Sequence, residues 1–263
     1  MNGTKRNTGA DPAPKVLILT PVKDAERHLD RYVANIEALD YPQHALAVGF
    51  LESDSQDQTM AVLRRHAPRL KARCRRVTIV KRDFGFRIPP GVPRWTAALQ
   101  LKRRTVLAKA RNHLLFRSLR DEDWVLWLDV DVISYPRDLI QQLLAVNRDI
   151  VHPHCVIGLG GPTFDRNGWS DQGRKLLQDF RGSAEPVPLD AVGASVLLVR
   201  ADRHRDGLVF PPFPYGRLNA AMRPRHPVWS SGEIESEGLG LLAQDMGYQC
   251  WGLPELEVFH LPE

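Results

Sequence analysis

Short apolar runs alternate with longer amphipathic segments along most of this chain. Apolar runs that are too short for buried helices and end in polar clusters predict strands. The predicted strands are 16–19, 46–51, 77–80, 124–128, 150–151, 194–199 and 256–259. Helices are predicted at 25–38, 60–66, 99–119, 139–146 and 235–246. This alternation predicts an α/β fold with a mostly parallel, doubly wound sheet and helices on both faces.

The segments outside these elements define the expected domain organisation. Residues 1–15 are polar and hold no apolar signal or anchor, which predicts a disordered N-terminal tail. Residues 16–263 are expected to form a single domain, since a chain of this length can enclose one large core. Stretches rich in glycine or proline predict loop excursions near 155–188 and 211–232.

Two aspartates, Asp129 and Asp131, directly follow the apolar run 124–128. The triplet Asp-x-Asp is common by chance, and a second copy precedes this run. The evidence for a ligand site is therefore the position of Asp129 and Asp131 at the end of a predicted strand. Open α/β sheets bind ligands where their strands end. Two carboxylates at that edge would repel each other unless a cation lay between them. The position therefore predicts a divalent cation that holds a phosphate.

Candidate ligand-binding residues follow the first two predicted strands in the same way. Thr20 and Pro21 end the first strand, and Glu52 and Asp54 end the second. In a parallel sheet these ends lie along one edge, so all four residues are predicted to contact a nucleotide. Asp54 could bind a ribose or base, or it could cap the following helix, and the two roles are equally expected.

Charge and cysteine content narrow the classes of partner. The net charge of +5 comes from 36 basic and 31 acidic residues, with the basic residues in local clusters. Such clusters are most often solvated faces, and no nucleic-acid recognition motif accompanies them, so no nucleic-acid partner is expected. Three widely spaced cysteines predict neither a disulfide framework nor a zinc site. No run approaches the roughly 18 apolar residues of a membrane span, so the expected location is cytoplasmic, with peripheral membrane association as an option.

Several short blocks, taken in order, resemble one known family. The chain resembles the GT-A class of nucleotide-sugar glycosyltransferases, and more closely the fungal mannan polymerase family of Golgi α-mannosyltransferases. The blocks that carry this resemblance are 17–23, 49–55, 108–112, 124–132, 164–169, 190–193, 235–240 and 252–254, followed by His260. An ordered series of blocks is far more specific than Asp-x-Asp alone.

The resemblance implies a metal-bound donor site. Asp129, Asp131 and His260 would hold Mn²⁺, or Mg²⁺, against the diphosphate of GDP-mannose, a role to which carboxylates and imidazole are suited. Judged without the resemblance, His260 would be a structural histidine at the end of a strand. Arg111, in an Ala-Arg-Asn block, would contact the diphosphate, with Lys109 as a weaker candidate.

The same resemblance implies the reaction and its acceptor side. Mannose would pass to a hydroxyl of a sugar or glycoconjugate with retention of configuration. Glu237 and Asp165 would be the catalytic carboxylates that face the acceptor or donor sugar. The ordinary alternatives are helix capping for Glu237 and a turn for Asp165, while Trp169 could stack on a sugar or pin its loop.

Two other enzyme classes fit parts of the pattern. A haloacid-dehalogenase-type phosphohydrolase would use Asp129 as its nucleophile, but that strand normally opens the fold and here it comes fourth. A sugar-nucleotide nucleotidyltransferase would carry a glycine-rich, arginine-containing turn after its first strand, where this chain has 20–23 instead. Both remain alternatives to the metal-dependent glycosyltransferase.

Overall fold

The structure is a computed structural model that describes residues 13–93, 96–216 and 232–261. The predicted tail at 1–15 and the predicted loop at 211–232 therefore lie largely outside the described residues. The described strands are β1 (Val16–Val22), β2 (Leu46–Glu52), β3 (Arg76–Lys81), β4 (Trp124–Leu128), β5 (Val132–Ser134), β6 (Ile150–Val156), β7 (Trp169–Ser170), β8 (Lys175–Leu176), β9 (Val187–Leu189), β10 (Val196–Arg200) and β11 (Cys250–His260). The described helices are α1 (Glu26–Ala38), η1 (Gln43–Ala45), α2 (Thr59–Arg73), α3 (Ala97–Ser118), α4 (Leu139–Ala145), η2 (Leu177–Phe180), α5 (Ala201–Arg205) and α7 (Glu235–Asp245).

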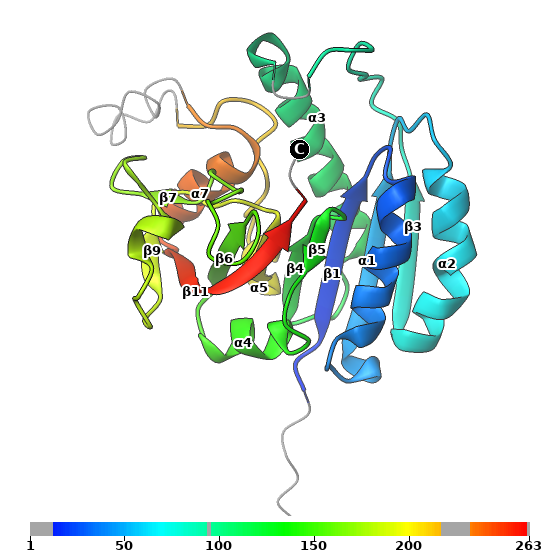
Figure 1. Cartoon of the computed structure of the whole chain (residues 1–263), viewed down its shortest axis with the longest axis horizontal. Helices are drawn as coiled ribbons and strands as arrows, with labels where there is room; N and C mark the ends of the chain where they lie inside the picture. The colour runs from blue at the N-terminus through cyan, green and yellow to red at the C-terminus, as the bar shows by residue number, and fades with distance from the viewer. Residues whose placement is uncertain (1–12, 94–95, 217–231, 262–263) are drawn as a thin grey trace, which may run out of the picture.

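One large sheet organises these elements. Its strand order is β3-β2-β1-β4-β10-β6-β11-β5, and β9 pairs with β11 outside this path. Strands β1 to β4 are mutually parallel, and β6 and β11 are parallel to each other. Because β10 runs antiparallel to both β4 and β6, it joins the two parallel groups into a mixed sheet. The ends of β1, β4 and β11 meet at one edge, at the top of Figure 1.

The structure extends several predicted elements. Helix α2 continues past Pro68 to Arg73, although a proline removes one backbone hydrogen bond from a helix. The continuation buries Leu70 and lets Arg73 donate to the carbonyl oxygens of Leu39 and Tyr41. Strand β11 begins at Cys250 instead of 256, and a register shift between Leu253 and Glu257 accommodates Pro254. The stretch 155–188, predicted as a loop excursion, contains β7, β8, η2 and the first residues of β9.

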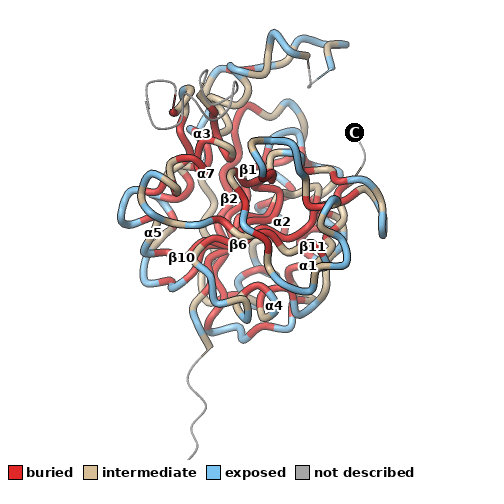
Figure 2. The backbone as a smooth tube through the Cα atoms, turned by 90° about the vertical axis from the view of Figure 1, so that its left-hand side faces the viewer, coloured by how far each residue is buried: buried red, intermediate tan, exposed pale blue. Residues whose placement is uncertain are grey.

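Helices cover both faces of the sheet. One core packs α1, α2 and α4 against the sheet, and a second core packs α3, α5 and α7 against the opposite face. Strand residues alternate between the two cores, so Ile18 and Leu126 face one while Leu17 and Trp127 face the other. Figure 2 shows buried residues concentrated along the central strands. Within the described residues, no helix is both long enough and apolar enough to cross a membrane.

The first two helices cap each other at the edge where the strands end. The backbone N–H of Glu26 donates to Asp57 (3.0 Å), and the N–H of Gln58 donates to the carboxylate of Glu26 (3.0 Å). The N–H of Ala25 donates to the Thr59 hydroxyl (2.8 Å). Free N–H groups at helix starts require such acceptors. This exchange holds the polar loops after β1 and β2 together beside the edge.

Candidate functional site

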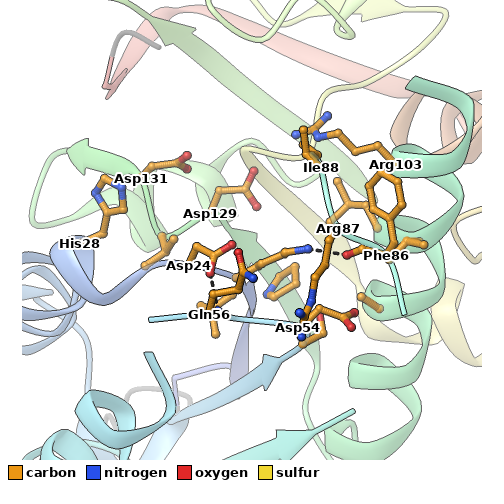
Figure 3. Close-up of a pocket in the computed structure, with 18 of the residues that line it drawn as sticks. Asp24, His28, Asp54, Gln56, Phe86, Arg87, Ile88, Arg103, Asp129 and Asp131 are labelled. Atoms are coloured by element: carbon orange, nitrogen blue, oxygen red, sulfur yellow. Dashed lines mark hydrogen bonds between the residues drawn. The ribbon is translucent and has the colours of Figure 1, made fainter. Parts of the chain in front are cut away.

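A cavity of about 530 Å³ opens at the edge where β1, β2, β4 and β11 end, and helix α3 forms one wall. Its size is within the usual range for small-molecule sites. Figure 3 shows Asp131 and His28 on one side, Arg103, Ile88 and Phe86 on the other, and Asp129 between them. Of the residues predicted to bind the nucleotide sugar or metal, those that line the cavity are Pro21, Asp54, Asp129, Asp131 and His260.

Two hydrogen bonds, one to the side chain and one from the backbone, hold Asp129 in place. Its carboxylate accepts a hydrogen bond from Arg111 at 3.0 Å, and its backbone N–H donates to the carbonyl of Ser195 at 2.8 Å. Burial raises the pKa of Asp129 to about 7; Arg111 acts in the opposite direction, and Asp131 adds to the rise. A cation bound beside Asp129 would favour its charged form and so lower its pKa.

Asp131 and His260 face each other at the rim of the cavity. His260 Nε2 lies 3.0 Å from Asp131 Oδ1, and the imidazole stacks on the ring of Phe164 with centroids 3.5 Å apart. Burial lowers the pKa of His260, but the hydrogen bond and charge of Asp131 raise it above its ordinary value overall.

A metal could bind to Nε2 of His260 only if the proton of the neutral ring is on Nδ1. Its Nδ1 lies 2.6 Å from the carbonyl oxygen of Leu261, which can only accept, so Nδ1 carries the proton. In the charged imidazolium, Nε2–H donates to the carboxylate of Asp131; in the neutral ring the lone pair of Nε2 faces that carboxylate, and a divalent cation between them could replace the proton. Among the described residues no group of three or more His, Cys, Asp and Glu side chains could hold a metal alone. A metal here would take some of its ligands from the protein and the others from a bound phosphate, as is usual for Mg²⁺ sites.

Arg111 lies beneath the cavity instead of in its lining. Its side chain is 2% exposed and lies over the rings of Trp127 and Phe210. Besides Asp129 it contacts Glu235, with Nε 2.8 Å from Oε1. Glu235 begins α7 with a φ of +62°, a backbone angle that residues other than glycine seldom adopt. Arg111 thus links the predicted metal-binding strand to α7, whereas Lys109 is exposed and does not line the cavity.

Thr20 and Glu52 stabilise the edge and do not line the cavity. The Thr20 hydroxyl is fully buried, bonds to Tyr32 and donates to the carbonyl of Leu128 at 2.8 Å. Glu52 is 1% exposed and accepts from the Ser55 N–H at 3.0 Å, with Lys81 Nζ at 2.6 Å from its second oxygen.

Asp54 anchors the loop that follows β3. It has a φ of +55°, and its carboxylate accepts hydrogen bonds from the N–H groups of Phe84 (2.8 Å) and Gly85 (3.0 Å). It does not cap α2, whose N-cap residue is Gln58. Asp54 also lines the cavity.

Glu237 and Asp165, predicted as catalytic, lie outside the cavity lining. Glu237 accepts a hydrogen bond from the indole N–H of Trp169 at 3.0 Å and pairs with Arg104 at 2.6 Å. Trp169 is 5% exposed, so it pins its loop. Asp165 accepts from the Ser195 N–H at 3.0 Å, and so supports the segment whose carbonyl holds Asp129.

Some cavity residues escaped the sequence interpretation. Lys23 donates to the carbonyl of Phe86 at 2.6 Å, which closes the loop after β3 over the cavity. Arg103, Val106, Leu107 and Ala110 line it from α3. Their spacing of three and four residues marks one face of a helix, a signal available in the sequence. Lys23 and Phe86 had no such signal, because they meet only in the folded chain.

Glu233, also missed, is a buried carboxyl beside Glu237. It is 6% exposed; burial raises its pKa to about 8, with Glu237 adding to the rise and Arg104 opposing it. Its ordinary pKa is 4.5, so the folded chain holds an extra proton between about pH 4.5 and 8. Folding stability therefore falls as pH rises through that window.

We expect Glu233→Gln to stabilise the protein relative to wild type increasingly as pH rises. The difference in unfolding free energy should grow by up to about 1.4 kcal/mol per pH unit between pH 5 and 8. Urea denaturation at four pH values measures it, with the exposed Glu185→Gln as the matched control. A difference that stays constant with pH would contradict the prediction.

Comparison with known proteins finds relatives among the subunits of fungal mannan polymerase complexes. A model of the Anp1 family matches residues 1–184. The chain is 30% identical over 286 residues to the mannan polymerase complex subunit mnn9 of Schizosaccharomyces pombe, covering 94% of this chain and 80% of that protein. It is 27% identical over 295 residues to the mannan polymerase II complex anp1 subunit of the same organism, covering 96% of this chain and 65% of that protein.

Solved structures show the same fold at low sequence identity. The mannosyltransferase PcManGT from Pyrobaculum calidifontis, in complex with GDP-Man and Mn²⁺, aligns with a TM-score of 0.59 and 17% identity over 96% of this chain and 59% of its own. S. aureus TarS 1–349 aligns with a TM-score of 0.54 and 13% identity over 94% of this chain and 60% of its own. The fold is therefore GT-A, as the sequence predicted.

Proposed function

Because the chain belongs to the Anp1 family, we propose that it is a metal-dependent mannosyltransferase that uses GDP-mannose as its donor. The acceptor is a hydroxyl of a sugar or glycoconjugate. The observation that carries the proposal is the meeting of Asp129, Asp131 and His260 at a cavity large enough for a nucleoside diphosphate. The GDP-Man and Mn²⁺ bound by PcManGT, and the mannan polymerase complexes to which the fungal relatives belong, support the choice of metal and sugar.

Asp131 and His260 would hold Mn²⁺ or Mg²⁺, with Asp129 beside them and donor phosphate oxygens as the remaining ligands. Bound there, the cation would act as a Lewis acid that neutralises charge on the departing nucleoside diphosphate. Arg111 keeps Asp129 in place through its charge-assisted hydrogen bond. Asp165 does the same through Ser195, so we assign it a positioning role.

Retention stays a prediction from the family resemblance; given retention, the cavity carboxylates favour attack on the face from which the nucleotide leaves over a double displacement. A double displacement would require a free carboxylate as nucleophile. Among the described residues, Asp24 accepts from the Gln56 N–H, Asp54 holds two backbone N–H groups, Asp129 pairs with Arg111 and Asp131 faces His260. Glu237 lies on α7 beside Trp169, and we propose it as the carboxylate of the acceptor side.

Thermal shift and turnover measurements test the proposal. We expect GDP to raise the melting temperature only when Mn²⁺ is present, and GDP-mannose to yield GDP faster when a mannoside acceptor is added. Phosphate release from phosphomonoesters that is lost in Asp129→Asn would instead support the phosphohydrolase alternative. Formation of GDP-mannose from GTP and mannose 1-phosphate would support the nucleotidyltransferase. The cytoplasmic location and the peripheral membrane association stay predictions.

A further inference from the structure

We propose that Glu233 is a positioning residue for the acceptor side of the reaction: as a neutral acid it donates a hydrogen bond to Glu237 and holds that carboxylate in place. This inference rests on the proposed function, which assigns Glu237 to the acceptor side. Glu233 would not touch the acceptor and would act only through Glu237. The two carboxyl groups would then carry one negative charge, which matches the single positive charge of Arg104 beside them.

The backbone fixes Glu233 beside the start of α7. Its N–H donates to the carbonyl of Tyr215 at 2.8 Å, and its carbonyl accepts from the Tyr215 N–H at 2.7 Å, which forms an isolated antiparallel bridge. Gly238 lets α7 pass close to this bridge, because a Cβ there would lie 2.8 Å from the carbonyl oxygen of Glu233. The side chain of Glu233 therefore extends from a backbone position that is held on both sides.

The side chain of Glu233 lacks a donor. Its Oε1 is buried, and none of the described residues forms a hydrogen bond with it. A buried carboxylate oxygen without a donor is unfavourable. The neighbouring carboxyl group, with which Glu233 forms a hydrogen bond, is that of Glu237, and an ionised carboxylate can only accept. A proton on Glu233 satisfies both side chains.

The other contacts of Glu237 favour its charged form. Its Oε1 accepts the indole N–H of Trp169 from β7 at 3.0 Å, and its Oε2 lies 2.6 Å from Arg104 on α3. Figure 1 shows α7 beside β7. Arg104 also donates to the carbonyl of Ile234, so its guanidinium is fixed at this end of α7. Because a donor and a cation both stabilise an ionised carboxylate, the proton of the pair stays on Glu233.

Few other groups near this pair titrate close to neutral pH. Arg104 from α3 faces Glu233, Glu235 and Glu237, and Glu235 is itself paired with Arg111. The hydroxyl of Tyr215 bonds to Asp245 at 2.7 Å, and burial and that carboxylate raise the pKa of Tyr215 to about 12. Tyr215 therefore stays neutral in the range where Glu233 titrates.

The proton on Glu233 makes the proposed role dependent on pH. Burial raises the pKa of Glu233 to about 8, with Glu237 adding to the rise and Arg104 opposing it. Below that pH Glu233 keeps its proton and its hydrogen bond to Glu237. Above it, two adjacent carboxylates repel each other and Glu237 loses a donor. Mannosyl transfer should therefore fall as pH rises through about 8.

Transfer rates of three forms of the full chain test this role. Glu233→Leu removes the donor and should lower kcat roughly ten- to a hundredfold at neutral pH, the usual effect of one charge-assisted hydrogen bond. Glu233→Gln keeps a donor that does not titrate, so it should recover most of that loss. The ratio of wild-type kcat to that of Glu233→Gln should fall roughly tenfold between about pH 7 and 9. The matched control is the exposed Glu185→Gln, whose pH profile should follow that of the wild type.

Infrared spectroscopy detects the proton on Glu233 without turnover. The wild-type spectrum minus that of Glu233→Gln isolates this carboxyl from Asp129, whose pKa burial raises to about 7. We expect the carbonyl band of a protonated carboxyl in that difference at neutral pH. The band should disappear as pH rises through about 8.

The outcomes separate this inference from the proposed function. If the wild type transfers no mannose although the infrared band is present, the proposed function fails and the proton on Glu233 stands. If the wild type transfers mannose but the band is absent, or the ratio of wild type to Glu233→Gln is constant with pH, the role of Glu233 is wrong. Wild-type kcat in Glu233→Leu, with only its stability lowered, would also overturn that role.

Discussion

We expect Asp131→Asn to lower mannosyl transfer about a thousandfold while the fold is retained. Asparagine keeps the shape of the side chain but removes the charge that, with His260 Nε2, would hold the cation. Loss of one group that stabilises charge in a transition state typically costs a hundred- to a thousandfold, and a metal ligand lies at the upper end. Transfer rates measured across a Mn²⁺ titration give the effect, and the variant should need more Mn²⁺ for half-maximal rate.

The control for this variant is Asp138→Asn, the same substitution at an exposed aspartate that bonds to Gln142. Its rate and Mn²⁺ requirement should match those of the wild type. His260→Gln should resemble Asp131→Asn in both measurements, since each variant removes one member of the pair. If Asp131→Asn retained a tenth of the activity at the wild-type Mn²⁺ requirement, Asp131 would not be a metal ligand.

We expect Arg111→Met to lower the free energy of unfolding by about 3–5 kcal/mol, the cost of breaking a buried ion pair from one side. Methionine fills similar volume between Trp127 and Phe210 but leaves Asp129 and Glu235 without their guanidinium. Urea denaturation at neutral pH measures the loss. The cost arises from desolvated charge, and it should therefore shrink when a partner is made neutral.

The double variant Arg111→Met/Glu235→Gln distinguishes charge from packing. If buried charge causes the loss, the double variant should be more stable than Arg111→Met alone. If the loss comes from packing around Trp127, the second substitution should give no recovery, and the role that we assign to Arg111 would be wrong. Lys109→Met, which removes an exposed charge of the same helix, is the control, and it should change stability by less than about 0.5 kcal/mol.

Local patterns in the sequence were enough to predict the fold class and several strand ends. The apolar run of β4 and the alternation of strands with helices indicated a layered α/β sheet, and the comparisons confirm GT-A. The direction of β10 was not predictable in this way, because an apolar strand buried on both faces looks the same whether its neighbours run parallel or antiparallel.

Some features of the cavity could also be predicted from the sequence, and others could not. Asp129 and Asp131 could be selected from sequence because they directly follow a buried strand, and His260 because the ordered blocks resemble a known family. Arg103 lines the cavity and Arg111 is buried beside it because of how α3 is rotated against the sheet, which neighbouring residues in the sequence do not reveal.

Periodicity and block order in this chain are local properties, and they were sufficient for its fold class, its family and its pair of acidic residues. Burial, ion pairing and the closeness of groups such as Glu233 and Glu237, or Lys23 and Phe86, depend on segments that meet only after folding. The pKa of a carboxyl and the accessibility of an arginine follow from those contacts. These contacts therefore decide which of two similar side chains lines the cavity and which is buried behind it.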